Sequence, residues 1–380
     1  MRQAGPPAPR PGSAGLGGLA RHDVGLYLAA AGTSVVGGLL VWSATARTDG
    51  TAYLVRHLLA AAVGLVLAVA VSRLGQARVR MAAPVLYGVA LLALVAVLTP
   101  VGLTVNGSRS WIPLAGGFTL QPAEFLKVGL CVVLAALLAA PADRGRTPGT
   151  REVLAAAGLV ALPVGLVLLQ PDLGSAAVVL AMGAVVVAVA GAPRRWLVGA
   201  ALLGVVVVVA ALTTPVLSDY QRDRITSFVD PSADPQGSGY QTRMVRTAIG
   251  SGGVWGQGFM AGERTQDGSV PYQLNDFVFS VAGEELGFVG ATGLLLLLGF
   301  VVLRVLRVAA RSDEPFGRLV AVGVAAWLAV QVVQNVGMNL GLLPVTGLPL
   351  PFVSYGGSSM VVSWLAVGLV DAAHTARRER

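Results

Sequence analysis

The sequence predicts an all-α integral membrane protein with ten transmembrane helices and a large extracytoplasmic loop between the seventh and eighth. Hydrophobic residues make up 55% of the 380 residues and charged residues only 12%, and the mean hydropathy is +0.73. Soluble domains carry about twice that charged fraction. The charged residues are also unevenly spread, because long apolar runs separate them.

The apolar runs define the spans in chain order. Most are close to the roughly 20 residues that a helix needs to cross hydrocarbon. The last run is long enough to cross twice, with the Pro- and Gly-rich stretch 343–355 as the break. The charge-free runs cover 24–46, 57–72, 81–108, 128–142, 153–171, 173–193, 196–218, 286–303 and 319–370.

The arginine distribution predicts the orientation. With the N-terminus inside, most of the 27 basic residues fall on the cytoplasmic side, in agreement with the positive-inside rule. Both termini are then cytoplasmic, and the chain is expected to be a multi-pass protein of the cytoplasmic (inner) membrane. This bias, together with affinity for anionic membrane lipids, accounts for the net charge of +8, so nucleic acid is not an expected partner.

The chain divides into a tail, a membrane domain and a second short tail. Residues 1–20 are rich in Pro, Gly and Ala and are expected to be disordered in the cytoplasm. No cleaved signal peptide is expected, because the apolar run that follows is too long. The membrane domain covers 21–375, and 376–380 form a cytoplasmic tail. The lone cysteine, Cys131, excludes a disulfide and a cysteine-based metal site.

The polar stretch 215–283 interrupts the membrane domain. Together with Glu284 and Glu285 it holds nearly half of the 19 acidic residues. A segment of this length must lie outside the hydrocarbon or line a water-filled cavity, because irregular backbone is not tolerated against lipid. This large extracytoplasmic loop is therefore where we expect the chemistry.

Glu124 and Lys127 open the fourth span in QPAEFLKVGL. They are three residues apart, hence on one helical face, and Lys127 is the only lysine of the chain. One interpretation is an ion pair that neutralises itself near the outer interface. The other is that Lys127 faces an outward-open cavity and binds an anion, since intramembrane charges commonly mark a functional path.

The preceding stretch NGSRSWIPLAGGF predicts a short outer loop that dips into the interface. Trp111 taken alone is best explained as an interfacial anchor, but with Arg109 beside it both residues are candidates for substrate binding. In the large loop, Arg243 and Arg246 share a helical face opposite apolar residues. This pattern fits equally a structural helix in the membrane plane and a substrate-binding helix. The glycines of IGSGGVWGQGF are only a weak signal for a phosphate-cradling loop, because no Gly-Lys-Ser/Thr follows.

Asp276 lies at the outer mouth of the eighth span, just before apolar Phe277, Val278 and Phe279. Loss of hydration makes a carboxylate a better proton acceptor near neutral pH, so Asp276 is the candidate general base. The structural alternative is a helix N-cap. Glu284 falls close to the same face and is a candidate residue of the substrate-binding site, where it could hold a cation or orient an arginine. Otherwise it is an ordinary first-turn acid.

Several strings together are more specific than any of these patterns. NGSRSWI, GFTLQPAEFLKV, QPDLGSA, DFVFSVAGEELGFVG and NVGMNLGLLPVTGLPLPFVSYGGSS resemble, in order from about residue 21 to 373, the SEDS family of bacterial cell-wall synthesis, which comprises the RodA, FtsW and SpoVE proteins. The resemblance implies ten transmembrane helices with a large external loop between the seventh and eighth. The GM of NVGMNLG is more similar to RodA, which implies a role in elongation and cell shape.

The resemblance also implies an activity and site residues. The activity is peptidoglycan glycosyltransferase, which polymerises lipid II (the undecaprenyl-pyrophosphate-linked disaccharide peptide) at the outer face of the membrane. Asp276 falls at the family's essential aspartate, and Glu124, Lys127, Arg243 and Arg246 fall at matched motif positions. Two departures are Ala123, where the family usually has Ser, and the lead-in PYQLN before Asp276.

The implied reaction inverts the anomeric centre, so one base and a single displacement suffice. Asp276 would take the proton, while Arg109, Lys127, Arg243 and Arg246, with a divalent cation (Mg²⁺ or Mn²⁺), would stabilise the leaving pyrophosphate. The metal ligands are not predicted. The resemblance further implies a class B penicillin-binding protein as partner, and the chain has no Ser-x-x-Lys pair of its own. Small residues of the eighth and ninth spans, such as Gly293, Gly323 and Ala325, are the expected contact surface.

Two other functions are considered. A lipid II flippase would need a polar pathway through the bilayer, whereas the inner halves of these spans are nearly free of charge. A non-catalytic scaffold of the cell-wall synthesis complex would not need a lone lysine and an aspartate directed at one cavity. Both are less favoured than the glycosyltransferase.

Overall fold

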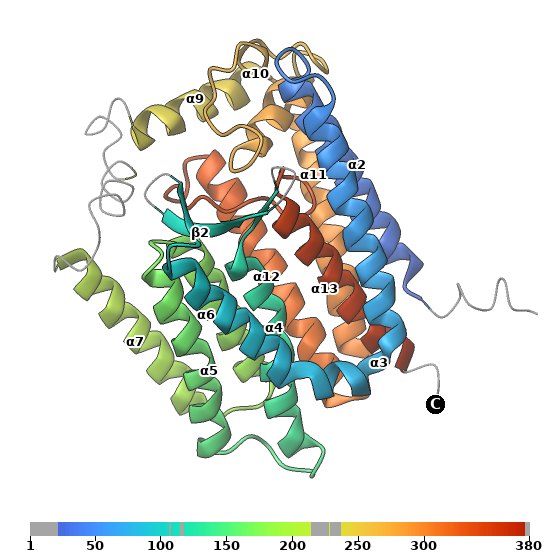
Figure 1. Ribbon diagram of the computed structural model, residues 1–380, viewed down its shortest axis with the longest axis vertical. Helices are drawn as coiled ribbons and strands as arrows, with labels where there is room; N and C mark the ends of the chain where they lie inside the picture. The colour runs from blue at the N-terminus through green and yellow to red at the C-terminus, as the bar shows by residue number, and fades with distance from the viewer. Residues whose placement is uncertain (1–21, 106–107, 115–117, 214–227, 229–236, 377–380) are drawn as a thin grey trace, which may run out of the picture.

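The computed structural model describes residues 22–105, 108–114, 118–213, 228 and 237–376, which form an apolar helical bundle with short elements gathered at one end (Figure 1). The described helices and strands are α2 (Val24–Thr45), α3 (Ala52–Leu98), β1 (Leu103–Val105), β2 (Ser108–Pro113), β3 (Thr119–Leu120), α4 (Pro122–Ala142), α5 (Thr150–Leu168), α6 (Leu173–Val189), α7 (Arg194–Thr213), α9 (Ser238–Ser251), α10 (Glu263–Gln266), α11 (Val278–Arg311), α12 (Pro315–Asn339) and α13 (Gly357–Ala376).

The helices agree with a multi-pass membrane protein. Among the described residues, six helices are long and apolar enough to cross a bilayer, and α6 is a shorter apolar helix. The 47-residue α3 has length for two crossings, and its two arms meet at Gly75, whose φ of 76° and ψ of 161° are not helical. The predicted break at 343–355 also lies between two helices, α12 and α13. The count of ten crossings stays a prediction.

Three predicted segments differ from the structure or lie outside it. The run 81–108 is helical only to Leu98, because Pro100 cannot donate a helical hydrogen bond, and Leu103–Val105 then pairs with β2 in an antiparallel sheet. Residues 215–227 and 229–236 of the large loop 215–283 lie outside the described residues, as do the tail 1–20 and residues 377–380 of the C-terminal tail 376–380. The described part of the large loop contains α9 and α10.

α12 runs through the middle of the bundle, in contact with α4, α6, α11 and α13. Small residues let these helices approach closely. A Cβ on Gly323 would lie only 2.6 Å from the Sγ atom of Cys131 on α4, and Ala325 is 3% exposed. The expectation that Gly323 and Ala325 contact a partner protein is therefore wrong, because both residues are already packed inside the bundle.

A glycine-rich stretch in the large loop packs against a break in α11. The helix is interrupted at Gly287, with φ 66° and ψ −166°, and this break frees backbone groups that a continuous helix would pair. Phe288 and Val289 donate their N–H groups to the carbonyls of Gly253 and Val254, at 2.9 and 3.1 Å. A Cβ on Gly256 would lie 2.2 Å from the Glu285 carbonyl oxygen. These glycines thus permit close backbone contact, and nothing in their geometry indicates a phosphate cradle.

Candidate active site

The end of the bundle that carries the sheet, α9 and α10 is called the loop end here. Figure 1 shows α9 and α10 lying across this end, above the sheet. All the sequence-predicted site residues belong to the sheet, to α9, or to the segments that begin α4 and α11. The sequence therefore placed them at one end of the molecule, and the structure decides which of them share contacts.

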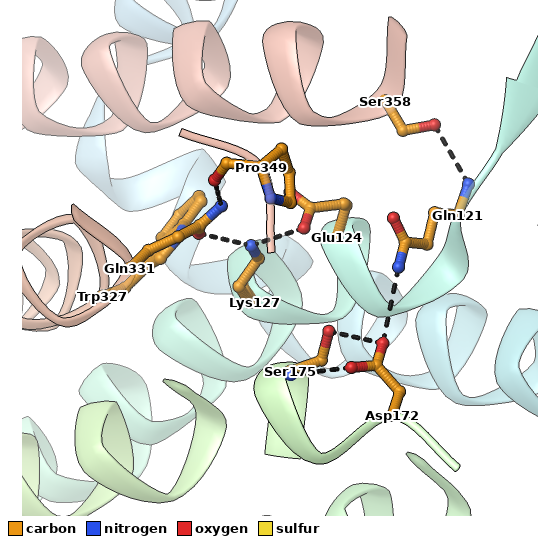
Figure 2. Close-up of polar contacts among 9 residues, drawn as sticks. All are labelled: Gln121, Glu124, Lys127, Asp172, Ser175, Trp327, Gln331, Pro349 and Ser358. Carbon is orange, nitrogen blue, oxygen red and sulfur yellow. Dashed lines mark hydrogen bonds and ion pairs between the residues drawn. The ribbon is translucent and has the colours of Figure 1, made fainter. Parts of the chain in front are cut away.

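Lys127 is the centre of a fully buried polar cluster (Figure 2). Its Nζ donates to Glu124 Oε1 at 2.7 Å and to Gln331 Oε1 at 2.8 Å, and it lies 5.0 Å from the centroid of the Trp327 ring. Trp327 Nε1 donates to the same Gln331 oxygen at 2.8 Å. The ammonium is thus neutralised and hydrogen-bonded, as a buried charge must be to avoid a large desolvation cost.

This geometry agrees with the ion-pair interpretation of Glu124 and Lys127. An anion could meet Lys127 directly only if the cluster opened. One atom of the cluster is still unused: Glu124 Oε2 is buried and accepts no hydrogen bond from the residues that the structure describes. Nearby, half-buried Asp172 caps α6 through Ser175 and accepts from Gln121 at 3.5 Å (Figure 2). Burial raises the pKa of the Asp172 carboxyl, and the hydrogen bonds from Ser175 oppose that shift.

A row of buried amides on α12 connects this cluster to Asp276. Gln331, Asn335 and Asn339 are four residues apart, hence on one helical face, and each is at most 1% exposed. Gln331 Nε2 donates to the Pro349 carbonyl at 2.8 Å, and Asn335 Nδ2 donates to the Leu348 carbonyl at 2.7 Å. The amide row therefore holds the stretch between α12 and α13 against the helix. The polar spacing was visible in the sequence, but its function was not recognised there.

The backbone of Asp276 is held against the amide row of α12. Its carbonyl oxygen accepts from Asn335 Nδ2 at 2.8 Å and from Asn339 Nδ2 at 3.1 Å. The two preceding residues are also fixed, because Tyr355 N donates to the Leu274 carbonyl at 2.9 Å and the Ser354 hydroxyl donates to the Asn275 carbonyl. The N-cap position of α11 belongs to Phe277, so Asp276 does not have the capping position considered above. Its side chain is half-buried on a rigid backbone.

Glu284 has partners other than the cation or arginine expected from the sequence. Its fully buried carboxylate accepts from the backbone N–H groups of Arg264 and Thr265, at 2.9 and 2.8 Å, and from the Thr265 hydroxyl at 2.7 Å. It thereby anchors α10. Glu285 similarly accepts from the Ser43 hydroxyl at 2.6 Å. In this geometry both glutamates hold the large loop onto α11 and α2. Substrate binding by Glu284 stays an untested prediction.

α9 brings Arg246 to the same region. Its apolar face does not lie in lipid as considered above, because Val245 and Ala248 are fully buried in one cluster with Phe277 and Met338. The arginines are on the exposed side. The Arg246 side chain lies against Gly341 at the end of α12, where a Cβ would be 3.0 Å from its Cδ. The helix that carries both Arg243 and Arg246 is thus docked on the residue that follows Asp276.

Arg109 and Trp111 belong to a different part of the loop end. Both are half-buried on β2, which contacts α3 and α4. Arg109 Nε donates to the Gly102 carbonyl at 3.1 Å and Nη1 to the Leu98 carbonyl at 3.5 Å, so it satisfies the C-terminal end of α3. The structure gives Arg109 a structural function. A contact with an anionic substrate stays a prediction.

A metal site made by the protein alone is not found in the described ranges. No three His, Cys, Asp or Glu residues among them come together in a way that could hold an ion. The Glu284 carboxylate already accepts hydrogen bonds from Arg264 and Thr265. The predicted Mg²⁺ or Mn²⁺ stays an untested prediction.

Comparisons with known proteins agree with this architecture. Residues 24–379 match the FtsW, RodA and SpoVE family, described as "Cell cycle protein", so the chain belongs to this family. It is 36% identical over 349 residues to peptidoglycan glycosyltransferase MrdB of Escherichia coli K12, covering 90% of this chain and 91% of that protein. Stage V sporulation protein E of Bacillus subtilis is 36% identical over 331 residues, covering 87% and 89%.

Solved structures show the same fold. A structure described as "Structural coordination of polymerization and crosslinking by a peptidoglycan synthase complex" matches with a TM-score of 0.79 and 37% identity, covering 94% of this chain and 99% of that one. The crystal structure of the rod shape determining protein RodA of Thermus thermophilus matches with a TM-score of 0.69 and 34% identity, covering 94% and 97%. The all-α membrane fold predicted from the sequence is confirmed.

Proposed function

We propose that this protein polymerises lipid II into glycan strands at the outer face of the cytoplasmic membrane, for cell elongation and shape. It is a peptidoglycan glycosyltransferase, in keeping with the names of its relatives. The observation that carries the proposed mechanism is the placement of Asp276. A half-buried carboxylate stands at the loop end on a backbone that two buried asparagines fix.

In the proposed step, the Asp276 carboxylate accepts the proton of the acceptor sugar's hydroxyl. The oxygen attacks the anomeric carbon of the donor, and the bond from that carbon to the pyrophosphate oxygen breaks with inversion. The lipid pyrophosphate leaves with the electron pair. General-base help of this kind contributes roughly 10²–10⁴ in rate, provided that the base is correctly placed. The hydrogen bonds that hold Leu274 and Asn275, together with the amide row of α12, supply that placement.

The leaving pyrophosphate needs positive charge near Asp276. Arg243 and Arg246 suit this function, because α9 holds them on its exposed side next to Phe277 and the end of α12. Preorganised charge at the site of developing negative charge is often a large catalytic contribution. Lys127 acts differently in this proposal. It is a positioning residue: it orients Gln331, which in turn holds the stretch between α12 and α13 at Pro349.

Asp276→Asn tests the base directly, because the substitution preserves shape and removes the proton acceptor. The assay is purified protein with labelled lipid II, in the presence of a penicillin-type inhibitor and the glycosyltransferase inhibitor moenomycin. The variant should express and melt like the wild type and make no polymer. Polymer above a few per cent of the wild-type amount would contradict the assignment. Transfer of lipid II across vesicle membranes without polymer would favour a flippase.

The proposed partner is a class B penicillin-binding protein, a single-span transpeptidase. Support comes from the similar solved chain that is described as part of a peptidoglycan synthase complex. On α11 the small residue Gly293 is exposed, and a Cβ there would meet nothing within 4 Å. Exposed Val289 and Leu296 flank it on the same face. This face, rather than the buried α12, is the proposed intramembrane contact.

Gly293→Leu tests this contact. It should weaken co-purification with the transpeptidase while leaving the melting temperature of the isolated protein unchanged, because the added side chain meets open space. Gly199→Leu on α7, where a Cβ also meets nothing, is the matched control. Equal retention of the partner by both variants would place the interface elsewhere.

A further inference from the structure

A cavity of about 990 Å³ opens at the opposite end of the bundle from Asp276. It forms where Gly75 breaks α3, because the two arms of that helix diverge there. The N-terminal turn of α12 and the last turn of α13 complete the wall. The polar residues that line the cavity include His22, Arg73, Gln76, Arg78, Arg80 and Glu314.

The charge of this cavity is positive. Arg73 and Arg78 are exposed, and neither makes an ion pair with a residue in the described ranges. Arg80 is already paired with Asp143 at 2.7 Å and lies 5.8 Å from the Phe316 ring centroid. Glu314 is the one acid among the lining residues. Two arginines are therefore available for an anion.

The acids behind the cavity wall have partners other than Arg73 and Arg78. Asp371 is fully buried, and its carboxylate is held by His22 Nδ1 at 2.6 Å, the Ser72 hydroxyl at 2.6 Å and the Asp23 backbone N–H at 2.8 Å. Asp23 is in turn paired with Arg304. The carboxylates of Asp371 and Asp23 are thus each held by partners within the protein.

The surroundings indicate where the anion comes from. The arginine distribution puts this end at the cytoplasmic surface of the membrane. Leu74 and Met81, which also line the cavity, are 48% and 78% exposed, so a ligand here meets apolar side chains beside the arginines. Residues 1–20, which precede the cavity in the chain, contain no Asp or Glu and cannot supply an anionic side chain. Guanidinium groups bind phosphate with paired hydrogen bonds.

We propose that this cavity binds the phosphate headgroup of an anionic phospholipid of the cytoplasmic leaflet. Arg73 and Arg78 pair with the phosphate, and the acyl chains leave along Leu74 and Met81. Gln76 joins the cavity wall to α13, because its Nε2 donates to the Ala373 carbonyl at 3.2 Å. Basic pockets between membrane helices on the cytoplasmic side are suited to such headgroups.

The test is native mass spectrometry of the purified full chain in detergent with added phosphatidylglycerol or phosphatidylcholine. The double variant Arg73→Gln with Arg78→Gln should lose bound phosphatidylglycerol by about tenfold or more, because each arginine at an anionic headgroup contributes substantially to binding. Arg194→Gln with Arg195→Gln is the matched control, with two exposed arginines at another turn of the same end. The control should bind like the wild type.

Three results would overturn the proposal. Equal loss in both double variants would show general surface attraction without a site. Equal binding of phosphatidylcholine, whose headgroup has the same phosphate but no net charge, would show that the cavity does not select anionic lipids. Displacement of phosphatidylglycerol by millimolar inorganic phosphate, with phosphate itself retained, would show a site for a soluble anion. Because Arg73 and Arg78 are exposed and unpaired in the described ranges, the melting temperature of the variant should match that of the wild type, and the single variants serve if it does not.

Discussion

Replacing Asn335 by Leu tests whether the buried amide row of α12 places Asp276, the proposed general base. Asn335 Nδ2 donates to the Asp276 carbonyl at 2.8 Å and to the Leu348 carbonyl at 2.7 Å, in surroundings with no solvent exposure. Leucine has similar volume and no donor. The substitution therefore removes the side-chain donor of the Leu348 carbonyl and one of the two donors of the Asp276 carbonyl, while changing the packing little.

The magnitude follows from those two bonds. The unsatisfied Leu348 carbonyl costs about 1–3 kcal/mol and the lost second hydrogen bond of the Asp276 carbonyl about 0.5–1.5 kcal/mol, so the free energy of unfolding should fall by about 1.5–4.5 kcal/mol. Asn339 still donates to the Asp276 carbonyl at 3.1 Å, so the segment shifts without being released. A displacement of about 1 Å at a reacting group can cost about a hundredfold in rate. We expect lipid II polymerisation to fall by about tenfold to a hundredfold.

The control is Gln334→Leu, one residue earlier on the same helix, where the side chain is half-buried and the hydrogen bonds to the Asp276 carbonyl come from Asn335 and Asn339 instead. Polymerisation is measured with labelled lipid II, and stability by thermal melting in detergent. Asn335→Leu should lower both and Gln334→Leu should lower polymerisation little. A normal rate in a destabilised Asn335→Leu protein would show that the amide row supports only the fold, and would refute the positioning argument.

Three further predictions follow from the same contacts. Lys127→Met leaves Glu124 buried without its partner and should lower the free energy of unfolding, followed by thermal melting, by about 3–5 kcal/mol. The additional substitution Glu124→Gln should recover most of that loss. If activity does not recover with stability, Lys127 contacts the substrate instead. Gly287→Ala should lower the melting temperature and speed limited proteolysis of 252–283, because φ is 66° and the new Cβ would lie 2.2 Å from Gly256 N; Gly293→Ala, in open space, should not. The pH–rate profile should have an acid limb that is absent from any residual rate of Asp276→Asn; an unchanged limb would belong to another group.

The sequence by itself determined the membrane class and the order of the spans. A bilayer imposes a length and an apolar composition on every crossing segment, so each apolar run of the sequence shows by itself that it can cross. The glycine break between the two arms of α3 fell between two predicted spans for this reason. The strings around Asp276 and Lys127 also placed these residues at one end of the bundle before any contact was known.

Only the tertiary structure decided which side chains meet. The spans are apolar on nearly all sides, so the sequence does not fix how far each helix is rotated about its own axis. That rotation buries Gly323 against Cys131 when its small size suggested a partner surface, and it turns Asn335 toward the Asp276 carbonyl. It also brings Lys127 into a hydrogen bond with Gln331, which is 204 residues away in the sequence. Contacts between distant segments follow from packing of whole helices, and packing is a property that no single run of residues contains.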